Sequence, residues 1–315
     1  MTRAFIFPGQ GSQAVGMGKA LAEAFAPARE VFQEVDDALS QKLSTIMWEG
    51  PENDLVLTEN AQPAIMAASM AIVRILQKEA GLDFAKHARL VAGHSLGEYT
   101  ALCAVAAFTL ADTARLLKAR GQAMQVAVPV GEGGMSALLG AEIDQAEGLA
   151  RECALVTNGV CVIANDNAPG QVVISGTKAA IDKAPEIAKT MGIKRAMALN
   201  VSAPFHSPLM QPAADKMAEV LAQVTIRPLA VPLVANVAAF EVQEPDVVRR
   251  LLAEQITGRV RWREGVLAFR GYGVATTVEA GGAKVLTGMV KRIDKELANL
   301  TLDSAADIEA FVKTL

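Results

Sequence analysis

The chain has 315 residues, of which 51% are hydrophobic, 4% aromatic and 20% charged, and its formal net charge is -4. This length suits one large α/β domain with an insertion, and the apolar content is enough for a sizeable core rich in aliphatic residues. The charge is mild and no basic block occurs, which excludes a typical nucleic-acid-binding protein. The most apolar stretch, residues 99–110, is shorter than the roughly 18 residues that a membrane span needs.

The cysteines and the first residues indicate where the protein works. Three cysteines, Cys103, Cys153 and Cys161, lie in apolar contexts without metal-ligand spacing, which predicts buried free thiols. The start MTRAFIFPGQG has an apolar run too short for a signal peptide. We therefore expect a cytoplasmic protein in a reducing compartment.

In chain order, short apolar strands alternate with helical patterns. A strand at 4–7 ends at a Pro-Gly turn, and helical periodicity follows at 18–38 and 63–79. A strand at 90–92 leads into GHSLG, a buried helix at 98–107 and an amphipathic helix at 112–126. Strand, glycine turn and helix in succession predict a parallel sheet with helices on both faces.

The middle of the chain has a different pattern. Strands at 135–139, 160–164, 171–175 and 195–199 and helices at 144–152 and 178–190 follow the order βαββαβ, with the turn-rich NDNAPG at 165–170. This order predicts a ferredoxin-like subdomain at 131–199, inserted into a core of residues 1–130 and 200–315. The core resumes with helices at 210–224, 246–254 and 283–297 and strands at 232–236 and 275–279.

The segment GHSLG at 93–97 matches the Gly-x-Ser-x-Gly nucleophile elbow, in which a serine is held on a sharp turn between strand and helix. The glycines allow that strand and helix to approach closely. The following helix directs its N-terminal N–H groups toward Ser95, and Leu96 N–H is the natural first oxyanion donor. The alternative is a structural turn without chemistry.

A nucleophilic serine needs a base, and the chain has three histidines. His87 lies in a polar approach to a strand, and His94 adjoins Ser95, where neighbouring side chains of the elbow point apart. His206, in a loop after the last strand of the subdomain, is the remaining candidate.

No carboxylate between Ser95 and His206 is a persuasive third member of a triad. The aspartates in that interval belong to helix starts, exposed helix faces or the NDNAPG turn: Asp112, Asp144, Asp166 and Asp182. A dyad, in which a backbone carbonyl or an amide holds the histidine, therefore stays open beside a triad.

Two further segments have a role only if Ser95 is a nucleophile. PGQGSQ at 8–13 follows the first strand and is either an ordinary turn or the source of a second oxyanion N–H. Arg120, near the end of a helix, is either a solvated side chain or a bidentate partner for a substrate carboxylate.

Together these motifs resemble the malonyl-CoA:acyl carrier protein transacylase family. The resemblance rests on FPGQGSQ at 7–13, GHSLGEY at 93–99, the RGQAMQ segment at 120–125, NDNAPGQVVISG at 165–176, APFHSPLM at 203–210 and EAGGAKVL at 279–286. It implies an α/β-hydrolase-like core with a ferredoxin-like subdomain, which agrees with the order of elements above.

The family resemblance implies a role for each matching residue. Ser95 would be the nucleophile, His206 its general base and acid, and Arg120 the partner of the malonyl carboxylate. The remaining implied positions are the oxyanion-hole N–H groups of Gln10 and Leu96, the histidine-orienting carbonyl of Gln255, and the substrate-site residues His94, Asn167, Asn165 and Phe205. Phe205 and Leu96 match malonyl-selective members rather than methylmalonyl-selective ones. EAGGAKVL departs from the usual Gly-Pro-Gly, which affects only the local turn.

The resemblance implies malonyl-CoA as substrate, acyl carrier protein as partner with its phosphopantetheine as acceptor, and no bound cofactor or metal. We expect a monomer that binds neither nucleic acid nor membrane. The alternatives are a serine thioesterase-like or proofreading acyl hydrolase of a polyketide pathway and a non-catalytic carrier-protein docking module. Fatty acid and polyketide carriers are not distinguished.

Overall fold

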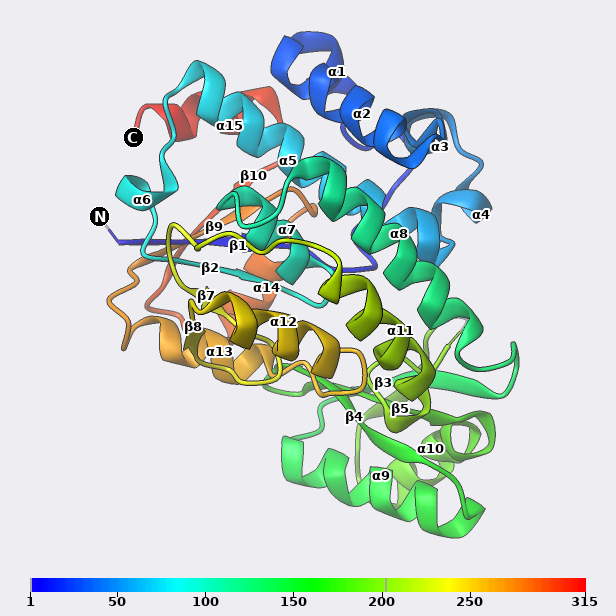
Figure 1. The fold of residues 1–315 in the computed structure, drawn as a ribbon. Helices are drawn as coiled ribbons and strands as arrows, with labels where there is room; N and C mark the ends of the chain where they lie inside the picture. The colour runs from blue at the N-terminus through cyan, green and yellow to red at the C-terminus, as the bar shows by residue number, and fades with distance from the viewer. Residues whose placement is uncertain (1, 202) are drawn as a thin grey trace.

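The computed structural model describes residues 2–201 and 203–315, and its larger sheet is mainly parallel (Figure 1). Within those residues the strand order is β10-β9-β1-β2-β7-β8, and all neighbours run parallel except β7 and β8. The strands are β1 (Arg3–Phe7), β2 (Leu90–Gly93), β7 (Leu233–Val234), β8 (Glu241–Val242), β9 (Thr276–Ala280) and β10 (Ala298–Leu302). The expected mixed α/β fold with a parallel sheet is confirmed.

Helices cover both faces of this sheet because successive strand side chains point to opposite sides. Phe5 and Phe7 belong to the core formed with α2 (Ala26–Leu39), α5 (Thr58–Glu79) and α8 (Leu110–Val126). Ala4 and Ile6 belong to a second core with α13 (Trp262–Phe269) and α14 (Val285–Ile293). The other helices of the larger part are α1 (Lys19–Ala24), α3 (Leu43–Glu49), α4 (Glu52–Leu55), α6 (Phe84–His87), α7 (Gly97–Ala104), the 3-10 turn Pro208–Met210, α11 (Gln211–Ala222), α12 (Pro245–Glu254) and α15 (Ala305–Val312).

A smaller antiparallel sheet lies at one end of the molecule, away from both chain termini (Figure 1). Its order is β4-β5-β3-β6, formed by β3 (Gly133–Leu139), β4 (Cys161–Ala168), β5 (Gln171–Thr177) and β6 (Arg195–Ala198). Two helices, α9 (Ile143–Thr157) and α10 (Lys178–Thr190), pack with it around a separate hydrophobic core. The buried members of that core all lie between Leu138 and Ile193.

The edge strand β4 joins the two parts and corrects one expectation. Residues 165–168 are strand rather than turn, because β4 continues to Ala168 through two irregularities in its pairing with β5. Val260 N–H donates to Ala164 O at 2.8 Å, and Asp166 N–H donates to Val260 O at 2.9 Å. The Asp166 carboxylate pairs with Arg263 at 2.9 Å. These outside partners satisfy backbone groups that a free turn would leave to water.

Other differences occur where helices end. The expected helix at 18–38 is two helices, because Phe25 adopts an extended backbone between α1 and α2. The expected helix at 283–297 ends at Ile293, and the chain then forms β10. Helices α3, α4, α6, α13 and α15 and strands β8 and β10 were not predicted.

The three cysteines are buried and free, as expected from their apolar contexts. Burial raises the pKa of Cys103 to about 12, which makes this thiol unreactive at neutral pH. Among the helices that the structure describes, none has both the length and the apolar character needed to cross a bilayer.

The turn between β2 and α7 is packed tightly against β1. A Cβ atom added at Gly97 would lie 2.2 Å from the carbonyl oxygen of Phe7, and one added at Gly93 would lie 1.9 Å from the carbonyl oxygen of Gly97. Both clashes are with backbone, which cannot rotate away. The two glycines are therefore required for this turn to form.

Gly97→Ala should destabilise the fold by about 3 kcal/mol, since overpacking against backbone forces the turn to shift. Gly288→Ala is the matched control, because Gly288 lies in α14 and an added Cβ meets nothing within 4 Å. The control should be neutral or stabilising by up to about 1 kcal/mol, as Ala favours helix over Gly. Urea unfolding measures both, and equal stability of the two variants would contradict the close approach.

Candidate active site

Ser95 occupies a strained turn at the carboxyl edge of the parallel sheet. Its φ of 53° lies in the left-handed region, which is unfavourable for a residue with a side chain. The strand β2 ends at Gly93, two residues before Ser95, and Leu96 is the N-cap of α7. Ser95 is partly exposed, in contrast to the buried strand before it. The turn thus presents the hydroxyl at the N-terminus of a helix.

His206 is within hydrogen-bonding distance of the Ser95 hydroxyl. Its Nε2 lies 2.8 Å from Ser95 Oγ, and its Nδ1 lies 2.8 Å from the backbone oxygen of Gln255. A carbonyl can only accept, so Nδ1 carries the proton and the neutral ring accepts the Ser95 hydroxyl proton at Nε2. This arrangement is that of a general base next to a nucleophile.

The surroundings of His206 keep the ring neutral. The side chain is 4% exposed, and its pKa is lowered to about 3, first by burial and then by the positive charge of Arg120. The carbonyl of Gln255 acts in the opposite direction. The ring is therefore in its base form over the whole physiological range.

Arg120 is a buried cation that contacts the Ser95 hydroxyl. It comes from α8, is 1% exposed, and donates from Nη2 to Ser95 Oγ at 3.1 Å and to Gln255 Oε1 at 2.9 Å. Its Nη1 donates to Gln62 Oε1 at 2.8 Å. Over the residues the structure describes, Arg120 has no carboxylate within salt-bridge distance.

The His94 side chain contacts β4. Its Nε2 lies 2.7 Å from Asn167 Oδ1, and its ring meets the Trp262 ring edge-to-face at 5.8 Å. Burial lowers the pKa of His94, and the Asn167 hydrogen bond opposes this. The small sheet thereby contributes Asn167 to the neighbourhood of the elbow. Phe205, 7% exposed, precedes His206 directly.

The loop after β1 lies against the elbow. Phe7 pairs with Gly93 at the ends of neighbouring parallel strands, and His94 N–H donates to Phe7 O at 3.0 Å. Gln10, three residues beyond Phe7, contacts Thr58 through its side chain at 3.4 Å. The turns that carry Gln10 and Leu96 thus start from adjacent strand ends.

The acids considered from the sequence lie elsewhere. Asp112 bonds Thr109, Asp182 pairs with Lys178, Asp166 pairs with Arg263, and Asp144 lies in the first turn of α9. The structure instead places at the site three residues that sequence reasoning missed: Gln62, Glu98 and Asn236. Only Glu98 had a signal, as the residue after GHSLG.

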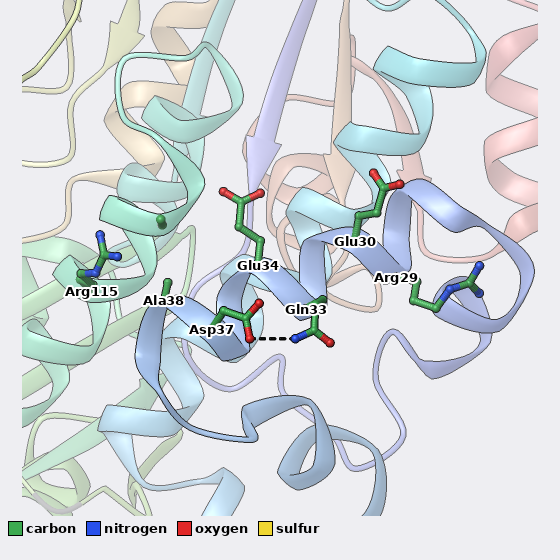
Figure 2. Close-up of a pocket in the computed structure, with 8 residues that line it drawn as sticks. Arg29, Glu30, Gln33, Glu34, Asp37, Ala38 and Arg115 are labelled. Carbon is green, nitrogen blue, oxygen red and sulfur yellow. Dashed lines mark hydrogen bonds between the residues drawn. The ribbon is translucent and has the colours of Figure 1, made fainter.

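The described residues hold no cluster of three or more His, Cys, Asp or Glu side chains able to bind a metal ion. A surface cavity of about 640 Å³ opens between α2 and α8, lined by residues such as Arg29, Glu34 and Arg115 (Figure 2). Its charged lining is mixed in sign, and none of its residues takes part in the Ser95 hydrogen-bond network.

Comparison with known proteins gives a family for this geometry. The model of the acyl transferase domain matches residues 4–308. The malonyl CoA-acyl carrier protein transacylase of Bacillus subtilis (strain 168) is 43% identical over 99% of this chain and 96% of its own length. The chain belongs to the malonyl-CoA:acyl carrier protein transacylase family. It is therefore an acyltransferase, and the resemblance seen in the sequence is confirmed.

Solved structures agree with this membership. The acyl-carrier-protein-S-malonyltransferase of Bartonella henselae has a TM-score of 0.97 and 52% identity, covering 100% of this chain and 99% of its own. A malonyl-transacylase solved in complex with a type II PKS acyl-carrier protein has a TM-score of 0.95 and 38% identity, covering 100% of both chains. Such similarity over the full length extends the family assignment to the whole fold.

The low pKa of His206 predicts how acylation depends on pH. Only the neutral ring can accept the Ser95 proton. As the pH is lowered, the ring becomes protonated only near pH 3, well below the ordinary histidine pKa. We expect kcat/KM for acylation to stay within about twofold between pH 5 and 7.5. Rapid-quench measurement of acyl-enzyme formation tests this, and a decline centred near pH 6.5 would contradict it.

Proposed function

We propose that this chain transfers a malonyl group from malonyl-CoA to the phosphopantetheine thiol of acyl carrier protein through a malonyl-Ser95 intermediate. The observation that carries the proposal is the buried Arg120 guanidinium 3.1 Å from Ser95 Oγ, with amide oxygens rather than carboxylates as its other partners. A buried cation that makes no ion pair is costly, and the free carboxylate of a malonyl group would pair with it directly. The names of the relatives above point the same way.

In the first half-reaction, Ser95 Oγ attacks the thioester carbonyl carbon of malonyl-CoA. The hydroxyl proton passes to His206 Nε2, and the tetrahedral intermediate then expels coenzyme A as its C–S bond breaks. The same proton goes to the departing sulfur, which leaves His206 neutral. Arg120 holds the malonyl carboxylate, so that binding orients the thioester toward the serine.

In the second half-reaction, the thiol of the phosphopantetheine arm attacks the malonyl-Ser95 ester. His206 takes the thiol proton and returns it to Ser95 Oγ as the C–O bond breaks. The two halves form a ping-pong cycle that needs no cofactor of its own, because the acyl carrier protein brings the phosphopantetheine. Gln255 orients His206 throughout with its backbone carbonyl.

The oxyanion of both intermediates is assigned to Leu96 N–H and Gln10 N–H. Support comes from the helix N-terminus at Leu96 and from the adjacent ends of β1 and β2, from which both turns start. An oxyanion donor of this kind contributes about 3 kcal/mol to catalysis.

Four more residues are assigned to the substrate site. His94 and Asn167 are linked at 2.7 Å beside the elbow, and Asn165, which bridges to Val260, lies two residues before Asn167 on the same strand. Phe205 precedes His206 and Leu96 follows Ser95, and both match the malonyl-selective rather than the methylmalonyl-selective members of the family.

We also assign the architecture as an α/β-hydrolase-like core, residues 1–130 and 200–315, with a ferredoxin-like subdomain at 131–199. The strand order β4-β5-β3-β6 with α9 and α10, and the separate core between Leu138 and Ile193, support that division. We expect the enzyme to act as a cytoplasmic monomer, with acyl carrier protein rather than nucleic acid or membrane as its partner.

Ser95→Ala should abolish the covalent adduct that forms when the protein is mixed with malonyl-CoA, because no other group carries the acyl chain. Intact-mass spectrometry measures the adduct, and the wild-type adduct should disappear when holo acyl carrier protein is added. An adduct on Ser95→Ala would show that another residue is the nucleophile. Rapid loss of the wild-type adduct to water without acceptor would favour hydrolysis over transfer.

Arg120→Gln should lower kcat/KM for malonyl-CoA by about 100- to 1000-fold, since two charge-assisted hydrogen bonds are lost. Acetyl-CoA lacks the carboxylate, so its kcat/KM should fall by less than about tenfold. Arg115→Gln is the matched control, an exposed arginine on the same helix that pairs with Asp112 at the surface. Equal losses for malonyl and acetyl transfer would contradict the carboxylate role.

A further inference from the structure

The strained backbone of Ser95 is held at both ends by side-chain amides. Its N–H donates to Asn236 Oδ1 at 2.7 Å, and its carbonyl accepts from Gln255 Nε2 at 3.0 Å, besides a turn bond from Glu98 N–H at 3.1 Å. A left-handed serine persists only where its surroundings enforce it. These amides come from segments 141 and 160 residues further along the chain.

Both amide residues are in turn held by one carboxylate oxygen. Glu98 Oε2 accepts from Gln255 Nε2 at 2.7 Å and from the backbone N–H of Asn236 at 3.1 Å. The three residues are almost completely buried, with Glu98 1%, Gln255 0% and Asn236 4% exposed. Asn236 Nδ2 also donates to Gly93 O at 2.6 Å, which ties the same unit to the end of β2.

Gln255 extends this unit to the other reacting groups. Its side-chain oxygen accepts from Arg120 Nη2, and its backbone oxygen is the partner of His206 Nδ1. A shift of Gln255 would therefore move the base, the cation and the Ser95 carbonyl together. The bond to Glu98 fixes which way the Gln255 amide faces, because its nitrogen must point to the carboxylate and its oxygen to Arg120.

We propose that Glu98 is a positioning residue for the acyl transfer, acting through Asn236 and Gln255 to set Ser95, His206 and Arg120 in reacting geometry. Glu98 itself bonds neither the Ser95 hydroxyl nor the His206 ring in the described structure. What it supplies is a hydrogen-bond acceptor at a fixed point beneath the elbow.

A purely stabilising role fits Glu98 poorly. A buried carboxylate loses its hydration, and an apolar side chain of similar shape is often as good or better for stability. Its second oxygen, Oε1, has no hydrogen-bond partner among the described residues, so part of that cost is uncompensated. What the carboxylate contributes is the acceptor Oε2, which holds Gln255 and the backbone of Asn236 in place.

The environment also shows which variant should replace Glu98. Burial raises the pKa of Glu98 to about 7, while the bonds from Gln255 and Asn236 and the charge of Arg120 act in the opposite direction. A proton on the unpartnered Oε1 leaves Oε2 free to accept both bonds. Glutamine can reproduce that protonated form, with its oxygen at the accepting position, whereas methionine keeps the length and removes the acceptor.

The test compares Glu98→Gln and Glu98→Met with wild type, and it rests on the proposed malonyl transfer only for its first readout. Single-turnover acylation by malonyl-CoA is measured at saturation, with the rate constant calculated per active site titrated by adduct mass. We expect Glu98→Met to acylate about 30- to 100-fold more slowly, at a half-saturating malonyl-CoA concentration changed by less than about threefold. Glu98→Gln should stay within about threefold of wild type in rate.

A second readout does not depend on the acyl donor. Phenylmethylsulfonyl fluoride sulfonylates a serine activated by histidine, and its reaction with Ser95 should slow in Glu98→Met by a similar factor and be restored in Glu98→Gln. If wild type takes the sulfonyl group but no malonyl group, the proposed function fails, while the comparison of variants still decides the role of Glu98.

A folded Glu98→Met with wild-type rates in both assays would overturn the proposal, as would a Glu98→Gln as slow as Glu98→Met. Circular dichroism and the titrated fraction of sites show whether each variant is folded. Should Glu98→Met not fold, Asn236→Ala decides, because it removes the anchor on Ser95 N–H and leaves the carboxylate and its bond to Gln255. A wild-type acylation rate in folded Asn236→Ala overturns the proposal as well.

Discussion

The close contact between α7 and β1 is the constraint on which the rest of the site depends. Because position 97 carries no side chain, its backbone can lie directly over the Phe7 carbonyl, and the chain must turn within the residues between Gly93 and Gly97. Such a turn places Ser95 in the left-handed region and points its hydroxyl out from the sheet edge. His206 and Arg120 reach that hydroxyl from a loop and a helix that pack separately against the core. A shift of the turn by even 1 Å would break both contacts, and misplacement of that size can cost about 100-fold in rate.

A carboxylate is not needed to orient the base when the backbone does it. In a serine triad an aspartate fixes the imidazole tautomer and stabilises the imidazolium. Here a carbonyl oxygen fixes the tautomer, and burial disfavours the imidazolium, as the pKa of about 3 for His206 indicates. In its proposed role as base His206 is correspondingly weak, so the proposed reaction must rely more on the electrostatic stabilisation of the oxyanion and on the position of the thioester. The positioning assigned to Glu98 and the binding assigned to Arg120 meet those two demands.

Local sequence patterns predicted the features of this fold that depend on neighbouring residues. Features that depend on contacts between distant parts of the chain were not predicted by these patterns. The parallel sheet, the order of the small sheet's elements and the GHSLG turn depend on short-range periodicity and glycine spacing, and they were predicted. His206 came from the small number of histidines, whereas Gln255 came only from the family resemblance, since no sequence pattern marks a carbonyl oxygen. Asn236 was missed because its partners, Gly93 and Ser95, are more than 140 residues away. The strand at 165–168 was read as a turn for the same reason, as its extra backbone partner is Val260.

The charges beneath Ser95 support the proposed preference for a malonyl group. Burial lowers the pKa of His206 and raises that of Glu98, so both shifts favour the neutral form of a titratable group. Arginine cannot lose its proton in the same range, although burial lowers the pKa of Arg120 too. Below neutral pH, where Glu98 is mostly protonated, Arg120 is thus the charged group of this network, and its hydrogen bonds to Gln62 and Gln255 satisfy donors without cancelling the charge. An acyl group that ends in a carboxylate would neutralise the Arg120 charge on binding, whereas an acyl group that ends in a methyl would leave that charge buried without an ion-pair partner. The proposed selectivity for a dicarboxylic thioester therefore needs only the electrostatics of the free site, before any contact with coenzyme A is considered.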